Sequence, residues 1–146
     1  MSDEVTGAAG FAGPQHGSFC WTEIGVKDAA RCKEFYSSIF GWTWQDSNAS
    51  KGPFAYHEFS TGGPYPAGGL YEIVPEMCED PNDLPPPHFM TYISVDDVDA
   101  YAAKATELGG TVIRPPMDIP NTGRFATLKD PTGAVFSIFT MQEAQS

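Results

Sequence analysis

Two stretches of the chain repeat one pattern of apolar and polar positions. Residues 19–26, FCWTEIGV, and residues 88–95, HFMTYISV, alternate in the period of a strand. Apolar residues then recur at helical spacing through residues 29–40 and 98–108. Laid on each other without a gap, the two stretches match at Thr22 and Thr91 and again at Gly41 and Gly110. The pattern predicts that the chain builds one structural unit twice.

Signals at both ends support each predicted helix. Asp28 and Asp97 stand where a carboxylate can cap the free N–H groups of a first turn, and glycines at 41, 109 and 110 suit a left-handed residue after the last turn. We expect each helix to bury one apolar stripe. In the first helix this stripe consists of Ala29, Cys32, Phe35, Tyr36, Ile39 and Phe40.

Three further strands are predicted after each helix. They cover residues 42–47, 54–60 and 67–74 in the first unit and 111–116, 124–130 and 134–141 in the second, with turn formers between them. Each unit is therefore βαβββ, and the fold class is α+β. A four-stranded sheet with one helix leaves its other face exposed, so two units should combine, either within the chain or by exchange with a second chain.

The chain divides into two units, a linker and two tails. We predict an N-terminal tail over residues 1–15, a first unit over 16–74 and a second unit over 88–141, followed by a C-terminal tail over 142–146. Residues 75–87 contain several prolines, which exclude a helix interior or a central strand and favour an extended linker.

Charge narrows the range of partners. Eight basic residues against 19 acidic residues give a net charge of −11, which repels nucleic-acid phosphates and anionic membrane surfaces. No apolar run approaches the roughly 20 residues that span a bilayer, and the first residues are acidic where a secretory signal is basic. We expect a cytoplasmic protein that binds neither nucleic acid nor membrane. Its three cysteines lack CxxC spacing and indicate no disulfide framework and no cysteine-based zinc site.

Several phrases in this order resemble one superfamily. The paired units, with DAARCKEFYSSIFGW, VDDVDAYAAKATELGG and GRFATLKDPTGAVFSI, are similar over roughly residues 17–141 to the vicinal oxygen chelate superfamily. This superfamily includes glyoxalase I, extradiol dioxygenases, fosfomycin resistance enzymes and bleomycin-binding proteins. The resemblance implies one domain with a cup-shaped, partly closed mixed sheet, a small-molecule ligand or metal in its hollow, and a homodimer.

The resemblance also implies where a metal would bind. Enzymes of this group hold it by His and Glu, with one ligand from the first and one from the fourth strand of each unit. Here those positions carry Trp21, Met90 and Ser137. Tryptophan cannot bind a metal, the Met90 thioether is a poor partner for the hard or borderline ions of these enzymes, and Ser137 replaces a glutamate, so at least three of the four positions are not ligands. The fourth strand of the first unit offers only Glu72, and its orientation is left open. We therefore expect that the usual metal centre is lost and that no cofactor is bound.

The same strand faces predict a ligand site. Alternation puts Glu23 on the face of Trp21, and His88 and Tyr92 on the face of Met90. Apolar walls with few polar groups suit a flat organic molecule, and a carboxylate in such surroundings is a candidate general base. We name Glu23 as the candidate catalytic residue. The candidate substrate-binding residues are Trp21, Glu23, His57, His88, Met90, Tyr92, Ser137 and Arg124. Arg124 is the candidate internal cation, with exposure at the surface as the equal alternative for an arginine at the start of a strand.

Three function classes remain open. The leading hypothesis is a metal-independent, small-molecule-binding protein of the glyoxalase and bleomycin-resistance type. The alternative is a metal-dependent lyase or dioxygenase whose divalent metal uses relocated ligands, with Glu23, His57, His88 and Glu72 as candidates. The third is a regulatory or interaction module whose hollow is filled by its own side chains, since aromatic and Met residues are also common core fillers.

Overall fold

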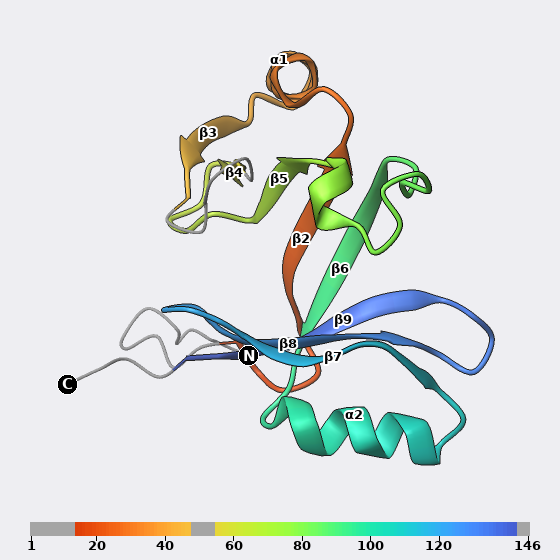
Figure 1. The fold of residues 1–146 in the computed structure, drawn as a ribbon. Helices are drawn as coiled ribbons and strands as arrows, with labels where there is room; N and C mark the ends of the chain where they lie inside the picture. Colours follow the sequence, from red (N-terminus) through yellow and green to blue (C-terminus); the bar gives the residue numbers. More distant parts are fainter. Residues whose placement is uncertain (1–13, 48–54, 143–146) are drawn as a thin grey trace.

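The computed structural model describes residues 14–47 and 55–142, so most of the two predicted tails lies outside the described residues. The first unit consists of β2 (Phe19–Val26), α1 (Ala29–Phe40), β3 (Thr43–Asp46), β4 (Tyr56–Ser60) and β5 (Gly68–Glu72). The second consists of β6 (His88–Ser94), α2 (Val98–Glu107), β7 (Thr111–Ile119), β8 (Gly123–Lys129) and β9 (Val135–Met141). The predicted α+β class and the repeated βαβββ order are confirmed (Figure 1).

The helix ends follow the predicted signals. The Asp28 carboxylate accepts a hydrogen bond from the Arg31 N–H, and the Asp97 carboxylate accepts one from the Ala100 N–H, each over 3.1 Å. Gly41 ends α1 with φ at 75°, a left-handed conformation that costs glycine little. Between the units, residues Pro75–Met77 form a short 3₁₀ helix, η2. It starts at a proline, which is tolerated there because the N–H group of a first helical residue has no partner within the helix.

One mixed sheet of eight strands joins both units within the described residues. The strand order is β3-β4-β5-β2-β6-β9-β8-β7. Each unit pairs its first strand in parallel with its fourth, β2 with β5 and β6 with β9, and the two first strands pair antiparallel with each other. The units therefore combine within this chain, through β2 and β6.

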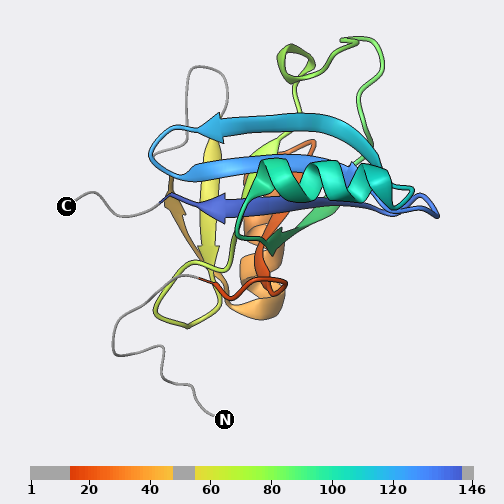
Figure 2. The ribbon, with the colours of Figure 1, turned by 90° about the horizontal axis from the view of Figure 1, so that it is seen from below.

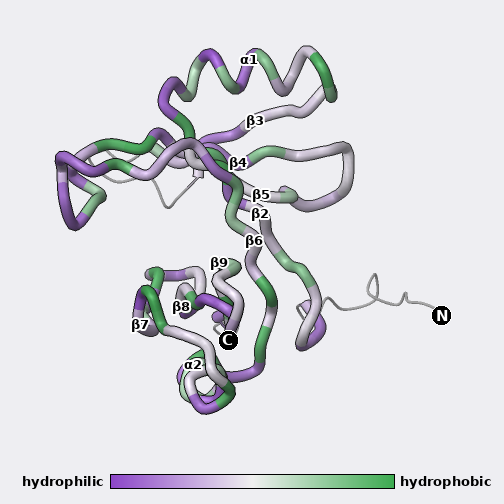
Figure 3. Tube along the Cα trace, turned by 90° about the vertical axis from the view of Figure 1, so that its right-hand side faces the viewer, coloured by the Kyte–Doolittle hydropathy of each residue, from purple (hydrophilic) through white to green (hydrophobic). Residues whose placement is uncertain are grey.

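The helices cover the outer face of the two half-sheets. Figure 1 shows α1 and α2 at opposite ends, with the strands of both units between them. Seen from below, α2 lies along β7, β8 and β9 (Figure 2), and from the side β2 and β6 run between the two helices (Figure 3). The inner face of the sheet carries no helix among the described residues, and it is the face on which the sequence analysis expects the hollow.

Each half-sheet has its own core beneath its helix. In the first unit Ile24, Val26, Phe59 and Leu70 are buried, and in the second the buried cluster consists of Val95, Val98, Ala102, Ala126, Leu128 and Ile138. Hydrophilic and hydrophobic residues alternate along both helices (Figure 3), as expected for helices that pack on one side. No helix within the described residues is long and apolar enough to span a membrane.

The predicted apolar stripe of α1 is only half buried. Ala29, Cys32 and Tyr36 pack against the core, whereas Phe35, Ile39 and Phe40 are 56%, 52% and 60% exposed. The prediction that all six residues form one buried stripe is wrong. The first three follow one another at spacings of three and four and form one line on the helix, while Phe35 and Ile39 form a second line beside it, which the sheet does not reach.

Candidate functional site

The carboxylate of Glu23 lies at the centre of the sheet. Glu23 belongs to β2, one of the two strands in the middle of the eight-stranded sheet, and its direct neighbours are Gly69 on β5 and Met90 on β6. Its Oε2 accepts a hydrogen bond from the Tyr56 hydroxyl over 2.8 Å, and its Oε1 accepts one from the Tyr92 hydroxyl over 3.1 Å. The side chain is only partly exposed. Two phenols from two different strands thus hold one carboxylate on the inner face.

Tyr56 reaches Glu23 because β5 carries glycine between them. Tyr56 stands on β4, two strands away from β2, and its ring lies against the Cα of Gly69 so closely that a Cβ there would collide with the ring. The Tyr56 oxygen also accepts a hydrogen bond from the Trp21 Nε1–H over 2.8 Å. Because the phenol hydrogen goes to Glu23, the three residues form a directed chain from Trp21 through Tyr56 to Glu23.

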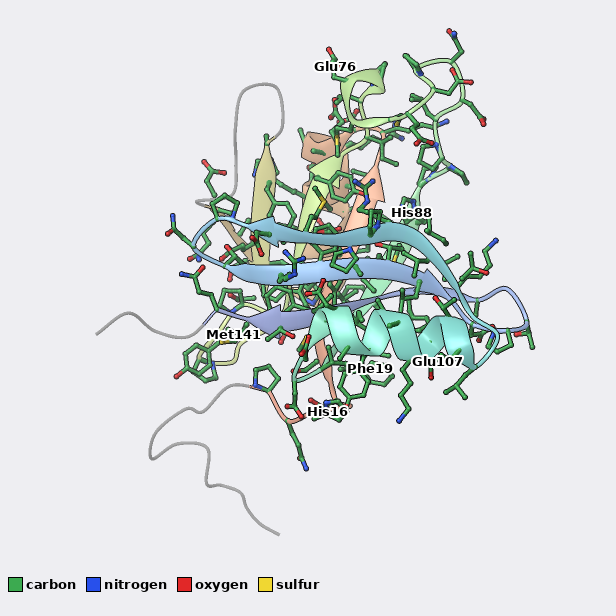
Figure 4. The ribbon with its side chains drawn as sticks, turned by 60° about the horizontal axis from the view of Figure 1, so that its bottom comes forward. His16, Phe19, Glu76, His88, Glu107 and Met141 are labelled. Atoms are coloured by element: carbon green, nitrogen blue, oxygen red, sulfur yellow. The ribbon has the colours of Figure 1, made fainter. Side chains whose placement is uncertain are left out.

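A second tyrosine lies beside the first. The Tyr71 ring is parallel to that of Tyr56 within 5°, with ring centroids 6.4 Å apart. A Cβ on Gly25 would come within 2.8 Å of the Tyr71 hydroxyl oxygen and 3.3 Å of His88 Cε1. Glycines on the neighbouring strands β2 and β5 therefore make room for aromatic rings on the inner face. His88, the first residue of β6, lies at this end of the site (Figure 4).

Burial dominates the electrostatics of the site. Desolvation raises the pKa of Glu23 above its ordinary value, although the two phenol hydrogen bonds and the charges of His88 and Arg114 lower it. Burial and the charge of Glu23 raise the pKa of Tyr56 and of Tyr92 far above the usual value, and they raise the pKa of Tyr71 to about 12. The phenols therefore keep their protons and donate them in hydrogen bonds to Glu23.

The second unit supplies the other side of the site. Tyr92 is opposite Trp21 on β2 and opposite Ser137 on β9 in the strand register. Ser137 is completely buried, and its hydroxyl lies 2.9 Å from the Thr127 hydroxyl on β8. The structure therefore brings six predicted site residues together on the inner face: Trp21, Glu23, His88, Met90, Tyr92 and Ser137.

Two other predicted residues lie elsewhere. His57 is opposite Leu70, a core residue beneath α1, and its Nδ1 lies 3.0 Å from an Asp46 carboxylate oxygen. Arg124 binds Asp99 on α2 over 2.8 Å and Asp118 over 3.0 Å, on the outer face of the second unit. Strand alternation turns both side chains away from Glu23. The expectations that His57 lines the hollow and that Arg124 is its internal cation are therefore corrected.

The relocated metal ligands do not converge either. The carboxylate of Glu72 accepts a hydrogen bond from the Ala29 N–H over 3.0 Å, at the start of α1 on the outer face. Glu72 and His57 are thus separated from Glu23 and His88 by the sheet itself. Within residues 14–47 and 55–142 no three His, Cys, Asp or Glu side chains lie together in an arrangement that could hold a metal ion.

The site contains residues that the sequence analysis missed. Tyr56, Tyr71 and Glu58 lie on the inner face of the first unit, where the Glu58 carboxylate accepts a hydrogen bond from the Gln45 side chain over 3.0 Å. Counting alternate residues along residues 54–60 could have found Tyr56 and Glu58. A second signal in the sequence was the glycine pair at 68 and 69, because glycine in a strand leaves space for a large side chain from the neighbouring strand.

A shallow depression lies away from this cluster. It encloses about 430 Å³ and is lined by residues of β7, β8 and β9, among them Arg124 and Thr140. Arg124 is already paired with two carboxylates there. The depression contains none of the inner-face residues around Glu23, so it is not the hollow that the sequence predicts.

Comparison with known proteins decides the family. The family model described as "Glyoxalase/Bleomycin resistance protein/Dioxygenase superfamily" matches residues 18–138. The chain belongs to this superfamily. A Mycobacterium tuberculosis protein, CFP32, described provisionally as a glyoxylase, is 34% identical over 122 residues, which are 82% of this chain and 44% of the relative. The anthracycline biosynthesis protein DnrV of Streptomyces peucetius is 32% identical over 129 residues, 84% of this chain and 46% of the relative.

Solved structures confirm the fold of this superfamily member. Methylmalonyl-CoA epimerase from M. tuberculosis superposes with a TM-score of 0.64 at 14% identity, covering 93% of this chain and 96% of that one. The Mn(II)-bound glyoxalase from Novosphingobium aromaticivorans superposes with a TM-score of 0.57 at 17% identity, covering 90% of this chain and 43% of that one. The chain spans less than half the length of the curated relatives CFP32 and DnrV.

Proposed function

We propose that this chain binds a small, flat organic molecule on the inner face of its sheet, without the metal centre of its enzymatic relatives, and that Glu23 is the acid–base group of the site. The observation that carries the proposal is the pair of hydrogen bonds from Tyr56 and Tyr92 to the Glu23 carboxylate. They hold a proton-exchanging group beside Trp21 and Met90, at the centre of the inner face.

The chemistry of the donor set argues against a metal here. Trp21 and Met90 stand at first-strand positions where relatives place ligands, and neither suits the hard or borderline ions of this superfamily. Each oxygen of the Glu23 carboxylate already accepts a phenol hydrogen, and the Ser137 hydroxyl is engaged with Thr127. A metal at Glu23 would have to share the carboxylate oxygens with these hydrogen bonds.

The surroundings of Glu23 favour proton transfer with a bound ligand. Its raised pKa brings protonation of the carboxylate closer to neutral pH, where a general acid or base works best. The two phenols stabilise the charged form through hydrogen bonds. The partly exposed Trp21 and Met90 on either side present apolar surface to a ligand. Since a relative is named for anthracycline biosynthesis, a polycyclic aromatic compound is a suitable first probe.

The first experiment separates metal from ligand binding. Protein purified without a histidine tag is subjected to elemental analysis, and Zn, Ni, Mn and Fe are then titrated in a calorimeter. We expect substoichiometric metal and no binding heat. We also expect an aromatic probe to change Trp fluorescence in the unmodified protein and to lose this effect in Trp21→Phe.

Matched carboxamide variants identify the group that acts. Glu23→Gln keeps the shape of the side chain and removes its ionisation, whereas Glu72→Gln makes the same change on the outer face. We expect proton uptake or release on probe binding to disappear in Glu23→Gln and to persist in Glu72→Gln. Near-stoichiometric metal that is lost in Glu23→Gln would refute the proposal and favour the metal-dependent lyase or dioxygenase.

A further inference from the structure

A bulge in β7 turns Arg114 toward the inner face. Val112 pairs with Leu128 and Arg114 pairs with Thr127, so Ile113 is an extra residue without a partner of its own. In a regular strand Arg114 would share the face of Val112, which packs against the core beneath α2. The extra residue places Arg114 on the face of Thr127 instead, which is a recognised effect of β-bulges.

The prolines that follow stabilise this arrangement. Pro115 and Pro116 continue β7, the edge strand of the second unit, at a place where the register with β8 is irregular, so neither missing N–H group breaks a regular ladder. A second irregularity in the register lies between Arg114 and Met117. Proline restricts the backbone beside Arg114 and thereby fixes the direction from which its side chain leaves the strand.

Strand register links Arg114 to the Glu23 site. Thr127 is opposite Ser137, Ser137 is opposite Tyr92, and Tyr92 is opposite Trp21, so one row of residues crosses the inner face from β7 to β2. The positive charge of Arg114 lowers the pKa of both Glu23 and Tyr71. The charge of the Arg114 guanidinium therefore acts along the inner face on the Glu23 carboxyl and on the Tyr71 phenol.

Arg114 has no carboxylate partner of its own in the part of the chain that the structure describes. The chain has three arginines, and Arg124 contrasts with Arg114 because its guanidinium is engaged with Asp99 and Asp118. No ion pair or hydrogen bond joins the exposed Arg114 side chain to another residue within 14–47 and 55–142. In a chain of net charge −11, Arg114 is thus a cation on the inner face that has no ion-pair partner among the described residues.

Charge is distributed unevenly along the inner face. Glu23 and Glu58 lie on the strands of the first unit, while Arg114 lies on the outermost strand of the second. His88 adds a second nitrogen donor or acceptor beside Glu23. Its Nδ1 lies 2.8 Å from the Pro86 carbonyl oxygen, which can only accept, so Nδ1 carries the hydrogen and Nε2 is the nitrogen left for a ligand.

We infer that the molecule bound in the hollow carries a carboxylate or a similar planar anionic group, that Arg114 holds this group, and that the rest of the molecule lies toward Trp21 and Glu23. This inference rests on the proposed function and names its ligand class. The fork of an arginine matches a carboxylate with two parallel hydrogen bonds. An anionic ligand would be repelled by Glu23 and Glu58 unless its charged end points toward β7.

A pair of probes of equal shape tests the inference. The probes are 2-naphthoate and 2-naphthamide, and their affinities are measured by calorimetry at pH 7. We expect the unmodified protein to bind the carboxylate about tenfold more tightly than the amide, as one charge-assisted contact provides. In Arg114→Gln this preference should disappear, because the variant binds 2-naphthoate more weakly. Its affinity for 2-naphthamide should stay within about twofold of that of the unmodified protein.

Two further variants make the test specific. Arg124→Gln removes a cation that is already paired on the outer face, and it should leave the preference for the carboxylate intact. Arg114→Lys keeps the charge but not the fork, and it should retain only part of the preference. Far-ultraviolet circular dichroism is used to check that each variant is folded. We expect the Arg114 variants to fold, because Arg114 is exposed on an edge strand.

The outcomes distinguish the inference from the proposed function. Equal binding of both probes by the unmodified protein, with Trp21→Phe weakening both, would overturn the role of Arg114 and leave the ligand site standing. An equal loss of preference in Arg114→Gln and Arg124→Gln would overturn it as well, because only general charge would then matter. Binding of neither probe would overturn both the inference and the proposed function.

Discussion

Tyr56 donates a hydrogen bond to Glu23 over 2.8 Å from a strand that is not adjacent to β2. The intervening strand, β5, carries Gly69 at the crossing point, and the Tyr56 ring occupies the space that a side chain would fill. Tyr92 completes the pair of donors from the other unit. The site therefore depends on both halves of the sheet and on one missing side chain, and these features lead to four predictions.

Removal of either phenol oxygen should destabilise the protein. In Tyr56→Phe or Tyr92→Phe the Glu23 carboxylate loses a donor, which costs about 1.5–3 kcal/mol for a hydrogen bond to a charged group. The free energy of unfolding in urea at pH 7 measures this cost, and the cost should shrink toward pH 4 as Glu23 becomes protonated. Tyr101→Phe is the control, because its hydroxyl has no hydrogen-bond partner within the described residues. An equal cost in all three variants would contradict the prediction.

The stability of the protein should depend on pH through Glu23. Its pKa in the folded protein lies above the value of 4.5 in the unfolded chain, because desolvation outweighs the hydrogen bonds. The folded state therefore binds this proton more tightly than the unfolded chain does. The stability that Glu23 contributes is fully present below pH 4.5, and it is lost as the pH rises through the raised pKa of the folded state.

Glu23→Gln isolates this effect from the other carboxylates. The unfolding free energy of the variant minus that of the unmodified protein should increase as pH rises above 4.5 and then level off. Urea titrations between pH 4 and pH 8 provide the measurement. A difference that decreases with rising pH would mean that the phenol hydrogen bonds outweigh burial and that the pKa of Glu23 is lowered.

A single methyl group at Gly69 should disrupt the site. In Gly69→Ala the new Cβ meets the Tyr56 ring, which must move away from Glu23, and we expect a loss of about 1–3 kcal/mol, the usual cost of an overpacked site. Gly63→Ala is the matched control, since no atom lies within 4 Å of its added Cβ and its φ is not positive. Urea unfolding measures the stability of both variants. The change in Trp fluorescence on probe binding measures the state of the site, and it should be smaller in Gly69→Ala than in Gly63→Ala. Equal effects of the two variants would refute the role of Gly69.

Glu72 should matter for stability and not for ligand binding. Its carboxylate accepts a hydrogen bond from the Ala29 N–H at the start of α1, where negative charge is favourable. Glu72→Ala should cost about 0.5–2 kcal/mol, as loss of a helix cap does, and leave probe affinity unchanged. Urea unfolding and calorimetry on the same variant measure both quantities. Weaker probe binding with unchanged stability would place Glu72 in the site and contradict its position on the outer face.

The repeated unit, the helix ends and the fold class could all be predicted from the sequence. These features follow from local patterns: alternation in β2 and β6, capping carboxylates at Asp28 and Asp97, and a glycine after α1. Alternation also grouped Trp21, Glu23, Met90 and Tyr92 correctly, because neighbouring positions of two regular strands keep their faces when the strands pair.

Only the tertiary structure decided which residues surround Glu23. Tyr56 reaches it across a glycine on another strand, and Arg114 turns inward because one extra residue in β7 shifts the register. Arg124, for which the sequence left an internal and a surface position open, lies on the outer face with Asp99. Strand alternation is a local property, but the face toward the hollow depends on pairing between distant strands and on bulges, which single-sequence patterns do not encode.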